Sequence, residues 1–171
     1  ATRDFPLATV MGAQVLAKNS THPQFLLSHD EFHTEIMRNV IMELTSQANK
    51  ALPFTDVNAF LGVLALLQPI SLANDALLTV IEEIYPELKK RDCWKIIDYL
   101  LDAGMLFKNG NKYRISPDLL ADFIVEQICI APDGKSTGFA EKLFKSLPTI
   151  YTENILVNLG RLDWKKSAGD T

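Results

Sequence analysis

The chain has 171 residues, of which 47% are hydrophobic and 22% are charged, and its formal net charge is −4. This is an ordinary globular composition with enough apolar residues for one sizeable core or two small ones. The acidic balance argues against a dedicated nucleic-acid-binding protein, which usually carries a basic excess, but it leaves room for a local basic patch.

The cysteines and the longest apolar run indicate the expected environment. Cys93 and Cys129 both fall in helical patterns, so we expect small buried side chains rather than a disulfide framework. A reducing, cytoplasmic setting is therefore expected. The apolar run at residues 60–70 is too short to span a bilayer and contains a proline, so no membrane association is expected.

The first unit, residues 1–52, is expected to be a helical segment. Residues 5–18 have apolar side chains at helical spacing, and Pro6 suits the first turn because its missing N–H would be unbonded there. Ser28 and Glu31 have the spacing of a capping box and predict a helix to about residue 48. Because the chain opens without a methionine in a turn-like stretch, we expect a piece of a longer protein.

Residues 53–130 are expected to form a second, tighter unit. The spacing of apolar residues predicts three helices, at about 56–67, 75–85 and 91–103. Asn74 is the expected N-cap of the second helix. Gly104 is the expected end of the third helix, because glycine accepts the left-handed conformation that follows many helices.

A β-hairpin is expected directly after these helices. Residues 106–115 surround Asn109-Gly110, a strong hairpin signal because both central residues of a type I′ turn need positive φ. Ser116 is the expected cap of a further helix, with Pro117 in its first position. Three helices followed by a two-stranded ribbon is the winged-helix pattern, in which the ribbon should pack against the first and third helices.

The third unit, residues 131–171, is expected to be an αα-hairpin with helices at about 137–147 and 149–160. It could be the first unit of a helical array, which would need further units to cover its face. The predicted fold class is thus mainly α: a helical segment, a winged-helix domain with a small β-hairpin, and the start of a helical-repeat array.

Two motifs suggest chemistry but fail on their context. Gly134-Lys135-Ser136 matches the end of a phosphate-binding loop, but Cys129 stands where the first glycine belongs and the preceding segment is a predicted helix. His29 and His33 have the spacing of a zinc-binding helix without a third ligand in the pattern. We therefore predict no catalytic residue, no metal site and no enzymatic activity for this chain.

A basic cluster is the strongest candidate site. Its residues lie at the start of the third helix and on the hairpin: Lys89, Lys90, Arg91, Lys95, Lys108, Lys112 and Arg114. In a DNA-binding winged helix these two elements contact DNA. Asp98 and Asp102, one turn apart on the same helix, would repel phosphates. A solvated or domain-contacting face is therefore the favoured interpretation, and a DNA-binding transcription regulator is the alternative.

The order of these parts resembles the segment that follows the nucleotide-binding core in signal-transduction ATPases with numerous domains, the STAND class. Members carry Gly-x-Pro at the first helical segment, and the stretch "DFP" here keeps Pro6. Many also end the wing with Met-His-Asp-Leu-Leu, and "SPDLL" here keeps Asp118 but has Pro117 in place of the histidine. Residues 155–165 resemble the start of a tetratricopeptide-like array.

The resemblance implies a non-catalytic regulatory segment. The winged helix would pack on the nucleotide-binding core of the parent chain and switch with nucleotide state. ATP or ADP and Mg²⁺ would be held by that core, with none bound by this segment alone. Pro6 and Asp118 would lie near the nucleotide, although Asp118 is also expected to bond first-turn amides or a neighbouring basic residue. The other implied partners are a repeat domain of the same chain and further copies in an activated homo-oligomer. The basic residues Lys90, Arg91, Lys95, Lys108, Lys112 and Arg114 would make interdomain contacts.

Overall fold

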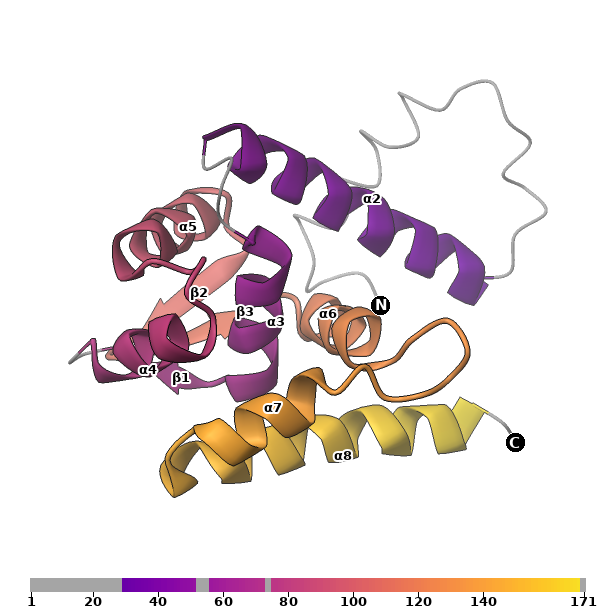
Figure 1. The fold of residues 1–171 in the computed structure, drawn as a ribbon. Helices are drawn as coiled ribbons and strands as arrows, with labels where there is room; N and C mark the ends of the chain where they lie inside the picture. The colour runs from indigo at the N-terminus through magenta and orange to yellow at the C-terminus, as the bar shows by residue number, and fades with distance from the viewer. Residues whose placement is uncertain (1–28, 52–55, 73–74, 170–171) are drawn as a thin grey trace.

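A computed structural model describes residues 29–51, 56–72 and 75–169 of the chain (Figure 1). These residues are mainly helical, with one small three-stranded antiparallel sheet. The expected helix at residues 5–18 and the Ser28 cap lie outside the described residues. None of the described helices is long and apolar enough to cross a membrane.

The described elements agree closely with the predicted ones. In chain order they are α2 (His29–Ala51), α3 (Val57–Leu67), β1 (Ile70–Ser71), α4 (Ala76–Ile84), α5 (Lys90–Asp102), β2 (Leu106–Asn109), β3 (Lys112–Ile115), α6 (Asp118–Cys129), α7 (Phe139–Ser146), the 3₁₀ turn η2 (Thr149–Tyr151) and α8 (Thr152–Gly169). The predicted helices and the hairpin in this part of the chain are confirmed, but α8 extends to Gly169 where its predicted end was about residue 160, and β1 is an additional strand.

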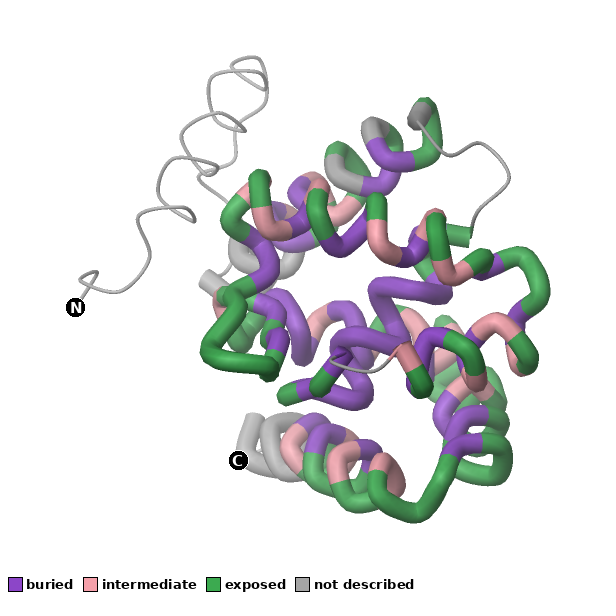
Figure 2. The backbone as a smooth tube through the Cα atoms, turned by 90° about the vertical axis from the view of Figure 1, so that its left-hand side faces the viewer, coloured by how far each residue is buried: buried purple, intermediate pink, exposed green. Residues whose placement is uncertain are grey.

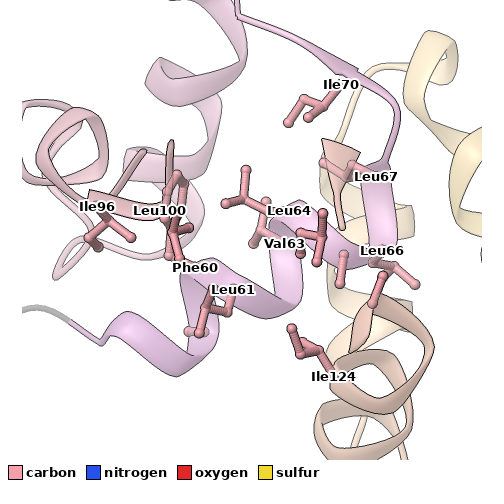
Figure 3. Packing of buried hydrophobic residues seen from close by; sticks show 14 of the residues in the cluster. Phe60, Leu61, Val63, Leu64, Leu66, Leu67, Ile70, Ile96, Leu100 and Ile124 are labelled. Atoms are coloured by element: carbon pink, nitrogen blue, oxygen red, sulfur yellow. The ribbon is translucent and has the colours of Figure 1, made fainter. Parts of the chain in front are cut away.

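Helix α3 is the centre of the fold, because it is apolar on every side and nearly all of its residues are buried. Its first turn is capped by Asp56, whose carboxylate accepts the backbone N–H of Ala59 at 2.9 Å. Side chains of α5, α6 and β1 pack against those of α3 (Figure 3). Gly62 lets α6 approach closely, since a Cβ at this position would come within 2.5 Å of Ile128 Cδ1.

The sheet has the strand order β1-β3-β2, with all pairs antiparallel. The buried pair Leu106 and Ile115 joins β2 to β3 and turns toward the core. The hairpin packs on α3 and α5, as predicted. The side chain of Gln68, which is buried just after α3, accepts the backbone N–H of Ile115 at 2.9 Å and so holds β3 to the end of α3.

The hairpin turn differs from the expected type I′ turn. Asn109 pairs with Lys112, so the two central residues are Gly110 and Asn111. Gly110 has φ 59°, whereas Asn111 is not among the described residues with positive φ. Glycine in the first central position with positive φ is the pattern of a type II′ turn. The strand register therefore places the Asn-Gly pair one position earlier than a type I′ turn requires.

Replacing Gly110 by alanine should lower the free energy of unfolding by about 1–2 kcal/mol, because an L-residue is strained at positive φ. The matched control is Gly160→Ala, which lies inside α8 with open space around the new Cβ. This control should raise the free energy of unfolding by about 0.5–1 kcal/mol. Urea denaturation measures both, and equal effects at the two positions would contradict the turn assignment.

Two predicted helix caps are wrong. The N-cap of α4 is Asp75, at φ 51°, rather than Asn74. The N-cap position of α6 is Pro117 rather than Ser116, and no side chain caps that helix. Ser116 donates its backbone N–H to the carbonyl oxygen of Met105 at 2.9 Å, so it continues the pairing of the hairpin.

Helices α7 and α8 pack back on the core. Asn158 donates its side-chain amide to the carbonyl oxygens of Leu66 and Gln68, both at 2.9 Å. These carbonyls lie at the end of α3, where the helix itself provides no partners. One cluster of buried apolar side chains includes residues from α2 to α8, and buried positions recur along the described chain (Figure 2). The expected unit boundaries after residues 52 and 130 stay predictions.

Candidate functional site

Part of the predicted basic cluster lies on the outer side of the β2–β3 hairpin, next to the start of α6. We define the hairpin face as Phe107, Arg114, Asp118 and Leu119. Phe107 is 64% exposed, although Leu106 beside it is buried. Phe107 pairs with Arg114 across the two strands, so both side chains lie on the same, outward side of the sheet. Leu119 adds a second exposed apolar side chain.

Asp118 ties this face to the rest of the molecule. Its Oδ2 accepts a hydrogen bond from Nη2 of Arg114 at 2.7 Å. Arg161, on α8, reaches the same Oδ2 at 3.8 Å and Oδ1 of Asp122 at 3.6 Å. The prediction that Asp118 bonds a neighbouring basic residue is therefore confirmed. Its position in the first turn of α6 also suits a carboxylate, because the helix N-terminus carries partial positive charge. Pro6 lies outside the described residues, and nucleotide contact by either residue stays a prediction.

The basic residues of α5 have acidic partners in this chain. Lys89 lies 3.3 Å from a carboxylate oxygen of Glu82, and Arg91 and Lys95 lie 3.6 Å and 3.1 Å from Asp92. Glu82 also accepts the backbone N–H of Lys90 at 3.1 Å. This hydrogen bond, together with the Lys89 ammonium, lowers the pKa of the Glu82 carboxyl. Two carboxylates therefore lie within ion-pair distance of three of the four cations at the start of α5, and they offset about half of its positive charge.

The remaining basic residues lie on the hairpin. The ammonium of Lys108 is 5.3 Å from the ring centre of Tyr113, its cross-strand partner, which is cation–π distance. Lys112 is exposed at the first position of β3. The structure thus places the predicted residues in two groups: the start of α5, where three cations are paired with carboxylates, and a hairpin with an exposed aromatic residue.

The two motifs that were rejected in the sequence differ in how much of each the structure describes. The segment at residues 130–138 follows helix α6, and its Lys135 ammonium pairs with Asp133 at 2.9 Å. A phosphate-binding loop would follow a strand. His29 and His33 begin α2, but their side chains lie outside the described ones. No group of three metal-ligating side chains occurs among the described residues.

Both cysteines are buried free thiols, as predicted. Burial raises the pKa of Cys93 to about 12 and that of Cys129 to about 11. We expect neither to react with a thiol reagent in the folded protein at about pH 8, and both to react in denaturing urea. Time-resolved labelling with mass detection checks this. Rapid labelling of either residue without denaturant would contradict the buried placement.

Three residues of structural importance were missed in the sequence: Gln68, Asn158 and Arg161. Each acts on a partner far away in the chain, so no local pattern marks it. Comparison with known proteins found no family model, no curated protein and no solved structure that matches this chain.

Proposed function

We propose that this chain is a non-catalytic winged-helix module that docks its hairpin face on another protein domain. The observation that supports it best is Phe107, a large aromatic side chain exposed on a short strand whose other side is buried. Aromatic residues, phenylalanine included, and arginine are enriched at protein interfaces relative to the rest of the surface. Phe107 and Arg114 lie side by side here.

The charge distribution supports a protein partner. The start of α5, which would enter the major groove of DNA in a winged-helix regulator, has its Lys89, Arg91 and Lys95 side chains within salt-bridge distance of carboxylates. Phosphates would have to compete with Glu82 and Asp92 for these cations. A protein surface that carries both charges could pack beside these ion pairs without breaking them.

The preorganised pair of Arg114 and Asp118 also suits a protein interface. Arg161 holds Asp118 from the side of α8, so the hairpin, α6 and α8 are linked by one set of charges. A partner that bonded Arg114 or Asp118 would therefore act on three elements at once. This is the kind of connection through which docking could bias a rigid-body movement.

By its resemblance to the STAND class, we propose that the partner is the nucleotide-binding core of the parent protein. The core would hold ATP or ADP with Mg²⁺, and the module would release it when the nucleotide changes. The element order α3-β1-α4-α5-β2-β3, with three helices around a small sheet, is consistent with a winged helix. The α7–α8 pair would begin the repeat domain, and the free thiols suit a cytoplasmic setting.

A photocrosslinking experiment tests this proposal. Phe107→p-benzoylphenylalanine in the full-length protein that carries this chain should crosslink to a nucleotide-binding domain in the ADP state, and several-fold less with a non-hydrolysable ATP analogue. The control places the same residue at Met42, which is also exposed but lies on α2. Crosslinks from position 107 only to nucleic acid, or none in either state, would overturn the proposal.

The alternative is a DNA-binding regulator, which is favoured by the exposed Lys108 and Lys112 on the hairpin. Titration of duplex DNA at several salt concentrations separates the two functions. At least micromolar binding that falls steeply with salt would establish phosphate contacts and exclude docking as the sole function. No binding at low salt, which we expect, would exclude the alternative.

A further inference from the structure

The segment from α7 to α8 carries most of the large apolar side chains that are exposed among the described residues. Four of the seven large apolar side chains that are exposed there lie between residues 144 and 157: Phe144, Ile150, Leu156 and Val157. Scattered exposed apolar residues need no explanation, but a cluster of them marks an interaction surface. These two helices form one edge of the molecule, away from α2 and α5 (Figure 1).

A groove lies within this edge. It has a volume of about 490 Å³ and is bounded by α7, α8 and the loop after α6. Its walls are mainly apolar, and they include Ala140, Phe144, Ile155, Leu156, Leu159 and Leu162. Phe144 is 44% exposed at its margin. The groove is therefore an apolar surface of the size that accepts large side chains from another helix.

An acidic and a basic side chain beside the groove are spaced so that each could pair with the opposite charge on a second copy of α7. Glu141 and Lys145 both line it and are one turn apart on α7. Glu141 is held in place by a hydrogen bond from the Ser136 hydroxyl at 2.6 Å. If two copies of α7 lie antiparallel about a two-fold axis, Lys145 of each copy faces Glu141 of the other. The same two-fold axis brings the two Phe144 side chains together at the apolar centre.

We propose that two copies of this chain associate through their α7–α8 edges, with Phe144 and Leu156 of each copy packed against the groove of the other. A two-fold interface uses the same patch on both subunits and must be self-complementary in shape and charge. The four helices would form a bundle that removes the exposed apolar side chains from water. This surface is distinct from the hairpin face, so dimerisation leaves the docking proposed above possible, whereas a following helical repeat and a second copy would compete for the same α7–α8 face.

Sedimentation equilibrium over a range of protein concentrations is the first test. The unmodified chain should dimerise with a dissociation constant on the order of 10 µM, as expected for a small interface. Leu156→Asp should make it monomeric at every concentration. The matched control is Met42→Asp, because Met42 is on α2 and is exposed to the same extent, 59%. The control should dimerise as the unmodified chain does.

Two charge reversals test the orientation. Lys145→Glu and Glu141→Lys should each weaken self-association about tenfold or more, because each places like charges opposite one another twice. An equimolar mixture of the two variants should form heterodimers, since both contacts are then between opposite charges. Thermal denaturation of each variant verifies that it is folded, which matters for Glu141→Lys because it loses the Ser136 bond.

Three results would overturn the proposal. The first is a chain that stays monomeric at the highest concentration studied, which would leave the groove to a different partner. The second is a dimer that Leu156→Asp does not weaken. The third is a mixture of folded charge-reversal variants that associates no better than either variant alone.

Discussion

Replacing Phe60 by alanine should lower the free energy of unfolding by about 3–5 kcal/mol, because a buried aromatic ring is removed and a cavity remains. Phe60 is fully buried in α3 and points toward α5, where Ile96 and Leu100 lie (Figure 3). Domains of this size are stable by only about 5–15 kcal/mol, so the substitution should remove a third or more of the total. Urea denaturation followed by far-ultraviolet circular dichroism measures the change.

The same substitution at Phe107 is the control. Phe107 is mostly exposed, so Phe107→Ala should change the free energy of unfolding by no more than about 0.5 kcal/mol. A loss of less than about 1 kcal/mol for Phe60→Ala would contradict the central position of α3. A loss at Phe107 as large as that at Phe60 would contradict the exposure of the hairpin face and with it the proposed docking.

The second large effect is expected at Asn158, where aspartate should lower the free energy of unfolding by roughly 3–5 kcal/mol at neutral pH. The wild-type amide donates to two carbonyl oxygens at the end of α3 and is buried. An ionised carboxylate has no proton to donate, so it would face both oxygens without a hydrogen bond. The hydrogen bonds that join α8 to the end of α3 would be replaced by electrostatic repulsion between the carboxylate and the two carbonyl oxygens.

The pH dependence of this variant gives an independent check. Burial against two carbonyl oxygens should raise the folded-state pKa of the introduced carboxyl above its unfolded value of about 4. The ionised form is then penalised above the folded-state pKa, and the deficit should shrink as the pH falls below it. Asn111→Asp, at the exposed hairpin turn, is the control and should show no such recovery. A deficit for Asn158→Asp that is independent of pH would contradict the proposed hydrogen bonds.

The helices were predictable because their signal is local. The apolar spacing of α5 and the almost wholly apolar run of α3 predict where each helix lies and which of its residues are buried, without information from the rest of the chain. The hairpin was predictable for the same reason. The buried state of Cys93 and Cys129 followed from their place in helical patterns.

The features that sequence reasoning missed depend on distant partners. Strand β1 has two residues, and only its pairing with β3 makes it a strand. The bonds of Gln68 and Asn158 join residues 47 and 92 positions apart. The turn type was missed because the pairing of Asn109 with Lys112, and not the Asn-Gly dipeptide, sets the central residues.

In the candidate site, too, the features with a local sequence signal were predicted and those that depend on distant residues were missed. The basic residues were found in the sequence, and Asp118 was expected to bond first-turn amides or a neighbouring basic residue, which the structure identifies as Arg114. The third member, Arg161, comes from α8 and has no local signal. The exposure of Phe107 required the strand register, since Leu106 and Phe107 are adjacent apolar residues and either could have faced the core.

The most direct test of the proposed docking is hydrogen exchange of residues 106–119 in the full-length protein that carries this chain, with ADP and with a non-hydrolysable ATP analogue. Docking on the nucleotide-binding core predicts that these amides are protected with ADP and exchange about tenfold faster or more with the ATP analogue. The amides of α3 should exchange equally in both states and serve as the internal control. Equal exchange of residues 106–119 with both nucleotides would contradict the account.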